Sequence, residues 1–71
     1  MKTEISNKVL DYIADHNSDP LDFMYAIMNE ADLTDERALG YLSESFGFKY
    51  TEEELKNVVA QYHAENQKNH D

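Results

Sequence analysis

The sequence contains no cysteine, no tryptophan, one proline and only two glycines. Without cysteine the chain can form neither a disulfide nor a thiolate metal site, and it has no thiol nucleophile. Long apolar runs are also missing, because the longest, Phe23 to Met28, is far shorter than the roughly 20 residues of a membrane-spanning helix. The first ten residues are mostly polar and lack the apolar core of a signal peptide. We therefore expect a soluble, cytoplasmic protein without membrane association.

Basic residues are scarce: 6 lysines and arginines stand against 15 acidic residues, which gives a formal net charge of -9 at pH 7. Such a surface repels phosphate groups, so we expect no direct binding to nucleic acid. It is attracted instead to a basic surface on another protein. A solvated acidic surface that only keeps the protein in solution is the simpler alternative. The charge thus favours a protein partner over a nucleic acid.

Motifs for catalysis and metal binding are missing as well. The sequence has no phosphate-binding loop, nucleophile elbow or dinucleotide fingerprint, and its three histidines are scattered. Asp15, Asn17 and Asp19 have the spacing of the first ligands of a calcium loop. However, Pro20 stands where that loop needs glycine, and Ala26 stands where it needs a bidentate glutamate. We predict a protein that is not an enzyme and binds no metal or cofactor.

Hydrophobic periodicity predicts a single all-α domain over residues 1–65, a compact bundle of four short helices, followed by a frayed tail at 66–71. The tail is expected because the last eight residues, "AENQKNHD", have no apolar period. The expected helices and their caps are Glu4 to His16 after Thr3, Pro20 to Glu30 after Asp19, Asp35 to Phe46 after Thr34, and a fourth from Glu52 after Thr51. The apolar stripe expected for the first helix is Ile5, Val9, Tyr12 and Ile13.

The second expected helix is apolar around more of its circumference than an ordinary surface helix. Its apolar side chains cover an arc of about 200°, roughly twice what one buried face requires. Two explanations are open: the helix is the centre of the bundle, flanked on both sides, or part of the arc contacts a partner. Phe23 and Tyr25 are the candidate partner-binding residues under the second explanation.

The third expected helix contains two residues outside its core-facing stripe. Gly40, on the polar side of the helix, costs about 1 kcal/mol relative to alanine. Tyr41 projects beside the stripe, and tyrosine is enriched at protein interfaces, so the pair forms a candidate docking spot. Alternatively, another helix or the tail crosses the backbone closely at Gly40. Glu36 and Glu44 are the carboxylates that we expect to attract a basic partner.

The stretch "FGFKYTEEEL", Phe46 to Leu55, predicts the end of one helix and the start of the next. Gly47 follows the last apolar residue of the third helix and is expected in the left-handed conformation, with Phe48 folded back on Leu42. Thr51, with a glutamate three residues later, predicts a capping box at the start of the fourth helix. The junction is thereby explained by helix-terminal chemistry.

The same junction resembles the end of the Nif-type leader-peptide domain. The residues that carry the resemblance are "GFKYTEEEL", Gly47 to Leu55, with its glycine–phenylalanine pair, aromatic, threonine and glutamate-rich helix start. In addition, "SDPL" at Ser18 to Leu21 is similar to the segment that separates two helices in that family. The resemblance covers roughly Val9 to Val59. It implies a leader-like handle, that is, a helical recognition domain that a peptide-modifying enzyme binds.

Two hypotheses for function follow. The first is a non-catalytic acidic module, a small inhibitor or adaptor of the phage or mobile-element type, that covers a partner protein's surface. In one variant its carboxylates imitate phosphates at a basic nucleic-acid-binding site of that partner. The alternative is the leader-like handle, and for either function we expect a monomer or a weak homodimer. The candidate partner-binding residues are Phe23, Tyr25, Glu36, Gly40, Tyr41 and Glu44.

Overall fold

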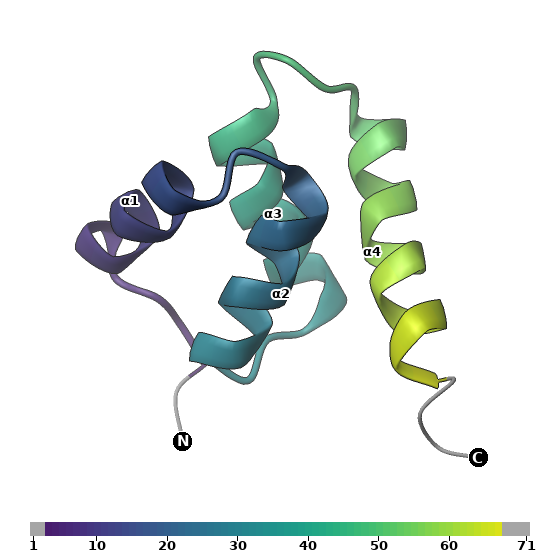
Figure 1. Cartoon of the computed structure of the whole chain (residues 1–71), viewed down its shortest axis with the longest axis horizontal. Helices are drawn as coiled ribbons and strands as arrows, with labels where there is room; N and C mark the ends of the chain where they lie inside the picture. The colour runs from purple at the N-terminus through teal and green to yellow at the C-terminus, as the bar shows by residue number, and fades with distance from the viewer. Residues whose placement is uncertain (1–2, 68–71) are drawn as a thin grey trace.

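The structure is a computed structural model that describes residues 3–67. Within that range it contains four helices and no strand: α1 (Asn7–His16), α2 (Pro20–Glu30), α3 (Asp35–Phe46) and α4 (Glu52–Gln67). Figure 1 shows the helices joined by short connections, with α4 beside the group formed by the other three. The predicted all-α bundle is confirmed.

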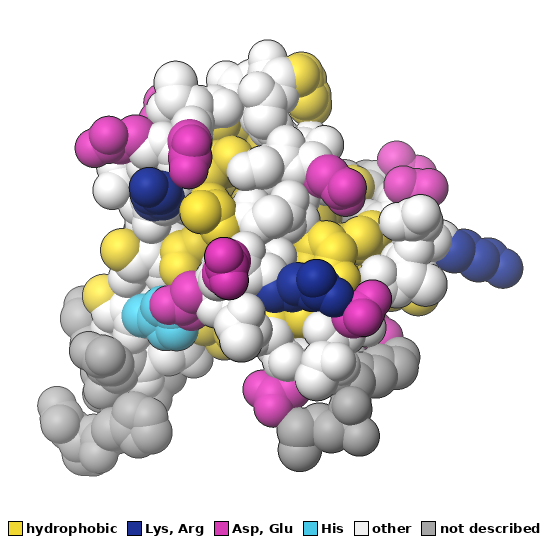
Figure 2. All heavy atoms as spheres, turned by 180° about the vertical axis from the view of Figure 1, so that it is seen from behind, with side chains coloured by type: hydrophobic (Ala, Val, Ile, Leu, Met, Phe, Trp, Pro, Cys, Tyr) yellow, Lys and Arg dark blue, Asp and Glu magenta, His cyan; other side chains and the backbone are white. Residues whose placement is uncertain are grey.

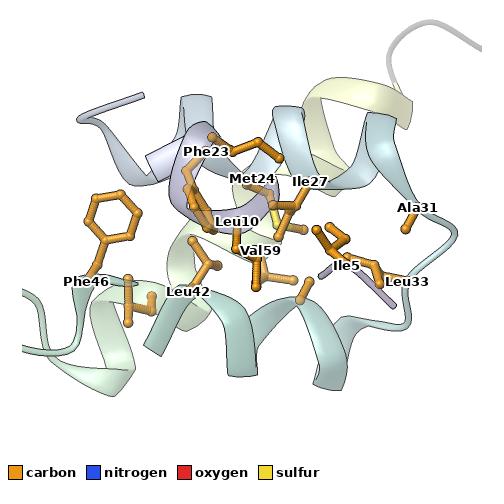
Figure 3. Packing of buried hydrophobic residues seen from close by; sticks show 13 residues of the cluster. Ile5, Leu10, Phe23, Met24, Ile27, Ala31, Leu33, Leu42, Phe46 and Val59 are labelled. Carbon is orange, nitrogen blue, oxygen red and sulfur yellow. The ribbon is translucent and has the colours of Figure 1, made fainter. Parts of the chain in front are cut away.

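The central helix is α2, which packs against each of α1, α3 and α4. Phe23, Met24 and Ile27 are fully buried, and the Phe23 ring meets the edge of Phe46 at a centroid distance of 5.2 Å. Figure 3 shows these side chains among apolar residues from the other helices. The wide apolar arc of α2 is therefore explained by its central position. The buried core comprises Ile5, Leu10, Ile13, Phe23, Met24, Ile27, Ala31, Leu33, Ala38, Leu42, Phe46, Leu55 and Val59.

The caps of α2 and α3 form as predicted. The Asp19 carboxylate accepts hydrogen bonds from the main-chain N–H groups of Leu21 and Asp22, at 3.0 and 3.4 Å. The Thr34 hydroxyl accepts one from the N–H of Arg37 at 3.2 Å. Each cap satisfies donors that have no partner inside the helix. Both helices begin and end at the expected residues.

Helix α1 begins three positions later than predicted, because Ser6 and not Thr3 is its cap. The Ser6 hydroxyl accepts the N–H of Val9 at 3.4 Å, while residues 3–6 are not helical. On α1 itself Leu10 and Ile13 are buried, whereas Tyr12 is 64% exposed. The Tyr12 ring lies on His16 at the surface, with ring centroids 4.2 Å apart. The assignment of Tyr12 to the core was wrong.

The connection between α3 and α4 differs from the predicted motif. Gly47 is right-handed, with φ -63° and ψ -19°, and donates its N–H to the carbonyl of Ser43 at 2.8 Å. A Cβ atom at Gly47 would lie 2.4 Å from that same carbonyl oxygen, so glycine is needed for close approach and not for a positive φ. Phe48 does not fold back on Leu42: it is 86% exposed, and Tyr50 packs against Phe46 instead.

The start of α4 matches the prediction. Thr51 donates its N–H to the Glu54 carboxylate at 2.8 Å, and the N–H of Glu54 donates to the Thr51 hydroxyl at 3.1 Å. Helix α4 continues to Gln67, so residues 66 and 67, which the periodicity assigns to the tail, belong to the helix. Asn66 is held there by a 2.8 Å hydrogen bond to the carbonyl of Tyr62. Residues 68–71 of the predicted tail lie outside the described residues.

None of the helices within residues 3–67 combines the length and the apolar character that crossing a membrane would require.

Candidate protein-binding surface

Four of the six candidate partner-binding residues line one open groove of about 570 Å³ on α3. We call it the Gly40 groove, because the groove runs along α3 from Glu36 to Glu44 and Gly40 is the middle residue of that segment. One side is formed by α3 and the other by residues before α1 and before α3. The lining residues are Thr3, Asp32, Thr34, Glu36, Arg37, Gly40, Tyr41 and Glu44.

The other two candidates, Phe23 and Tyr25, do not line this groove. Phe23 has no exposed surface, so it cannot anchor a partner, and its place in the bundle centre corrects that prediction. Tyr25 is 38% exposed, but its ring packs against Tyr62 on α4 at 4.9 Å, and its hydroxyl donates a 2.5 Å hydrogen bond to Glu65. Tyr25 thus joins α2 to α4.

Gly40 lies on the exposed face of α3. A Cβ atom there would have no atom of the described residues within 4 Å, apart from its own chain neighbours and helix backbone. The alternative that another segment crosses closely at this glycine is therefore wrong for residues 3–67. Packing among the described residues gives no reason for a glycine here, although it weakens the helix by about 0.5–1 kcal/mol relative to alanine.

The electrostatic character of the Gly40 groove is acidic. Glu36 and Glu44 form no hydrogen bond or ion pair with another residue of the range 3–67. Arg37, the one cation that the described residues contribute to the lining, is engaged by the carboxylate of Glu4 at 3.0 Å. Figure 2, which views the molecule from behind, shows acidic side chains along the edges of the exposed hydrophobic areas. An incoming cation would therefore meet carboxylates that no other side chain of residues 3–67 neutralises.

Tyr41 has a role that the sequence did not reveal. Its hydroxyl accepts a hydrogen bond of 3.0 Å from the main-chain N–H of Ile5, a residue whose side chain is buried. The segment at residues 3–6 is thus held against α3 and supplies the far wall of the groove through Thr3. The one local signal for this arrangement is Ser6, which is as good a helix cap as Thr3 and leaves Ile5 free to pack independently.

A second, smaller groove of about 330 Å³ lies between α3 and α4. Its lining is more apolar, and it shares Glu36 with the Gly40 groove. Near it, His63 of α4 and Asp35 at the start of α3 are in contact, with Nε2 and Oδ1 2.6 Å apart. The lining residues are Asp35, Glu36, Leu39, Lys56 and Val59.

Chemically, these surfaces offer hydrogen bonds, ion pairs and apolar contact. Within residues 3–67, no group of three or more histidine, cysteine, aspartate or glutamate side chains is arranged to hold a metal ion. Phe48 and Tyr12, both expected to be packed, are large exposed aromatic side chains outside the two grooves.

Comparison with protein families finds no matching family model, and neither the curated proteins nor the solved structures contain a significant match to the chain.

Proposed function

We propose that this chain is a non-catalytic protein-binding module, a small inhibitor or adaptor whose acidic α3 face covers a basic surface of a partner protein. The observation that carries the proposal is Gly40, an exposed mid-helix glycine over which no other segment of the described chain packs. Glycine allows another backbone or a ligand to approach more closely than any other residue does. A partner seated at Gly40 supplies the reason for the glycine that the described fold lacks.

The charge of the groove supports a basic partner. Glu36 and Glu44 lie on either side of Gly40, and neither is neutralised by another residue of the described part of the chain. Carboxylates in this position accelerate encounter with a basic surface and contribute less once the two surfaces are in contact. In its more specific form, the proposal takes the basic surface to be a nucleic-acid-binding site of the partner, where the carboxylates of Glu36 and Glu44 occupy the positions of phosphate groups.

In the first step of the test, the immobilised chain captures a partner from its own cell. In the second step, the rates of association and dissociation between the chain and that partner are measured at low and high salt. We expect the charge-removing pair Glu36→Gln and Glu44→Gln to slow association and to reduce its dependence on salt. Glu53→Gln is the matched control, because it removes the same charge from an exposed position outside both grooves. Association that is independent of salt, or equally affected by Glu53→Gln, would contradict the proposal.

The leader-like handle is the second candidate, and exposed Phe48 favours it. This residue belongs to the glycine–phenylalanine pair that carries the resemblance, and it is 86% exposed and outside the apolar core. A modifying enzyme that grips the module at Phe48 would use an apolar contact, so its binding would respond little to salt. Phe48→Ser would then abolish binding, while Glu36→Gln would leave it unchanged.

A further inference from the structure

One row of side-chain positions along the outer face of α3 contains Glu36, Gly40 and Glu44, each four residues after the one before. Side chains in such a row form a ridge on the helix surface. At 1.5 Å per residue, the two glutamates are about 12 Å apart along the axis. Because Gly40 has no side chain, the ridge is interrupted by a notch between two carboxylates.

The notch is open to another helix. Among residues 3–67, no atom lies within 4 Å of the Cβ position at Gly40, other than those of its neighbours and its own helix backbone, and Tyr41 forms the adjacent wall. When helices pack by inserting the ridges of one between the ridges of the other, their axes approach to 8–10 Å, and small residues at the crossing give the shorter distance. A helix that crosses α3 at Gly40 can therefore place one side chain in the notch.

Charge complementarity decides which helix fits. The carboxylates of Glu36 and Glu44 flank the notch, and the nearby Arg37 is paired with Glu4. Lysine or arginine side chains about one turn before and after the crossing point would reach these two carboxylates. A second copy of the chain, crossing through the same face, would instead bring glutamates against glutamates, which is repulsive.

We infer that the docking element of the partner is a basic α-helix that crosses α3 at Gly40, with an apolar side chain in the notch and a cation on each side. This inference rests on the proposed function and names the kind of partner surface that the module covers. It distinguishes a helical element from an extended basic segment or a flat basic cleft.

The experiment titrates the full chain, labelled for amide NMR, with a synthetic peptide of about 18 alanine-rich residues, long enough to form a helix in water. The peptide carries a central leucine and an arginine four residues before and four residues after it. The control peptide keeps the leucine and both arginines but contains two internal prolines, which prevent the helix. We expect the helical peptide to bind at least tenfold more tightly and to shift the amide signals of residues 36–44 most.

Variants of the chain complete the test. Gly40→Ala should weaken the binding of the helical peptide about tenfold while the melting temperature rises, which separates loss of binding from loss of the fold. Glu36→Gln with Glu44→Gln should also weaken binding, and Glu53→Gln should not.

Three outcomes would overturn the inference: equal binding of both peptides, no binding of either, or concentration-dependent shifts at Gly40 without peptide, which would reveal self-association. Equal binding of both peptides would leave the proposed function standing, because a basic partner would still be selected by charge. The proposed function fails separately, if association of the captured partner is independent of salt.

Discussion

The main-chain N–H of Ile5 donates a 3.0 Å hydrogen bond to the phenolic oxygen of Tyr41, a residue 36 positions later in the chain. The contact joins the segment before α1 to the middle of α3. Glu4, next to Ile5, reinforces it through an ion pair with Arg37 at 3.0 Å. The buried Ile5 side chain completes the attachment. One wall of the Gly40 groove therefore depends on how this segment is held.

Replacing Tyr41 with phenylalanine tests that attachment, because it removes the hydroxyl and keeps the ring. The partly buried N–H of Ile5 would lose its acceptor, so we expect the free energy of unfolding to fall by about 0.5–1.5 kcal/mol. Urea denaturation followed by circular dichroism measures the loss. Tyr12→Phe is the matched control, because the Tyr12 ring is largely exposed and its hydroxyl has no hydrogen bond to another described residue. Equal effects of the two substitutions would contradict the structural role of Tyr41.

The parts of the fold that the sequence predicted correctly are set by local interactions. Asp19, Thr34 and Thr51 each cap a helix by bonding to residues within three positions, so their effect is visible in a short window of sequence. The same locality explains the candidate site. Glu36 and Gly40 share a groove because they share one face of a single helix.

The errors at Ile5 and Phe48 have different causes, one a contact with a distant residue and the other the geometry of a local turn. Ile5 fits the period of a helix that begins at Glu4, but its N–H is bound by Tyr41, and the helix begins later. Phe48 is placed outside the bundle by a tight turn in which the N–H groups of Lys49 and Tyr50 both donate to the carbonyl of Phe46. A hydrophobic period reports neither a contact with a distant residue nor the geometry of a turn.

The two glycines should respond to alanine in opposite directions. At Gly40 a methyl group meets open space, so Gly40→Ala should stabilise the fold by about 0.5–1 kcal/mol through better helix propensity. At Gly47 a methyl group would lie 2.4 Å from the carbonyl oxygen of Ser43, and relief of that overlap should cost about 1–3 kcal/mol. Thermal denaturation of the two variants compares them directly. If Gly40→Ala instead destabilised the fold, the space next to Gly40 would have to be occupied by another group.

The capping box at α4 should act as a coupled pair. Thr51→Ala removes the acceptor for the N–H of Glu54, and a loss of about 1 kcal/mol is expected. Glu54→Ala removes the acceptor for the N–H of Thr51. Because each residue positions the other, the double variant should lose less than the two single losses added together. Full additivity in urea denaturation would show that the two hydrogen bonds form independently.

Tyr25 should titrate at a higher pH than a free tyrosine. The hydrogen bond that its hydroxyl donates to the Glu65 carboxylate is the main cause of the raised pKa, with partial desolvation and the negative charge of Glu65 adding to it. All three favour the neutral phenol in the folded chain. An unperturbed tyrosine has a pKa of 10.0, so the stabilisation is fully present below about pH 10 and is lost as the pH rises through the higher folded value.

The measurement is the tyrosinate absorbance of the folded protein during an alkaline titration. We expect a component above pH 10 in the wild-type chain that is absent from Tyr25→Phe. Glu65→Gln is the sharper variant, because an amide oxygen can still accept the hydrogen bond but carries no charge to oppose ionisation. In this variant the pKa of Tyr25 should fall back toward 10.0. In parallel, the stability difference between wild type and Tyr25→Phe should be constant from neutral pH to about pH 9 and then shrink. A component that persists in Tyr25→Phe would assign the raised pKa to another tyrosine, and the link between α2 and α4 through Glu65 would lose its support.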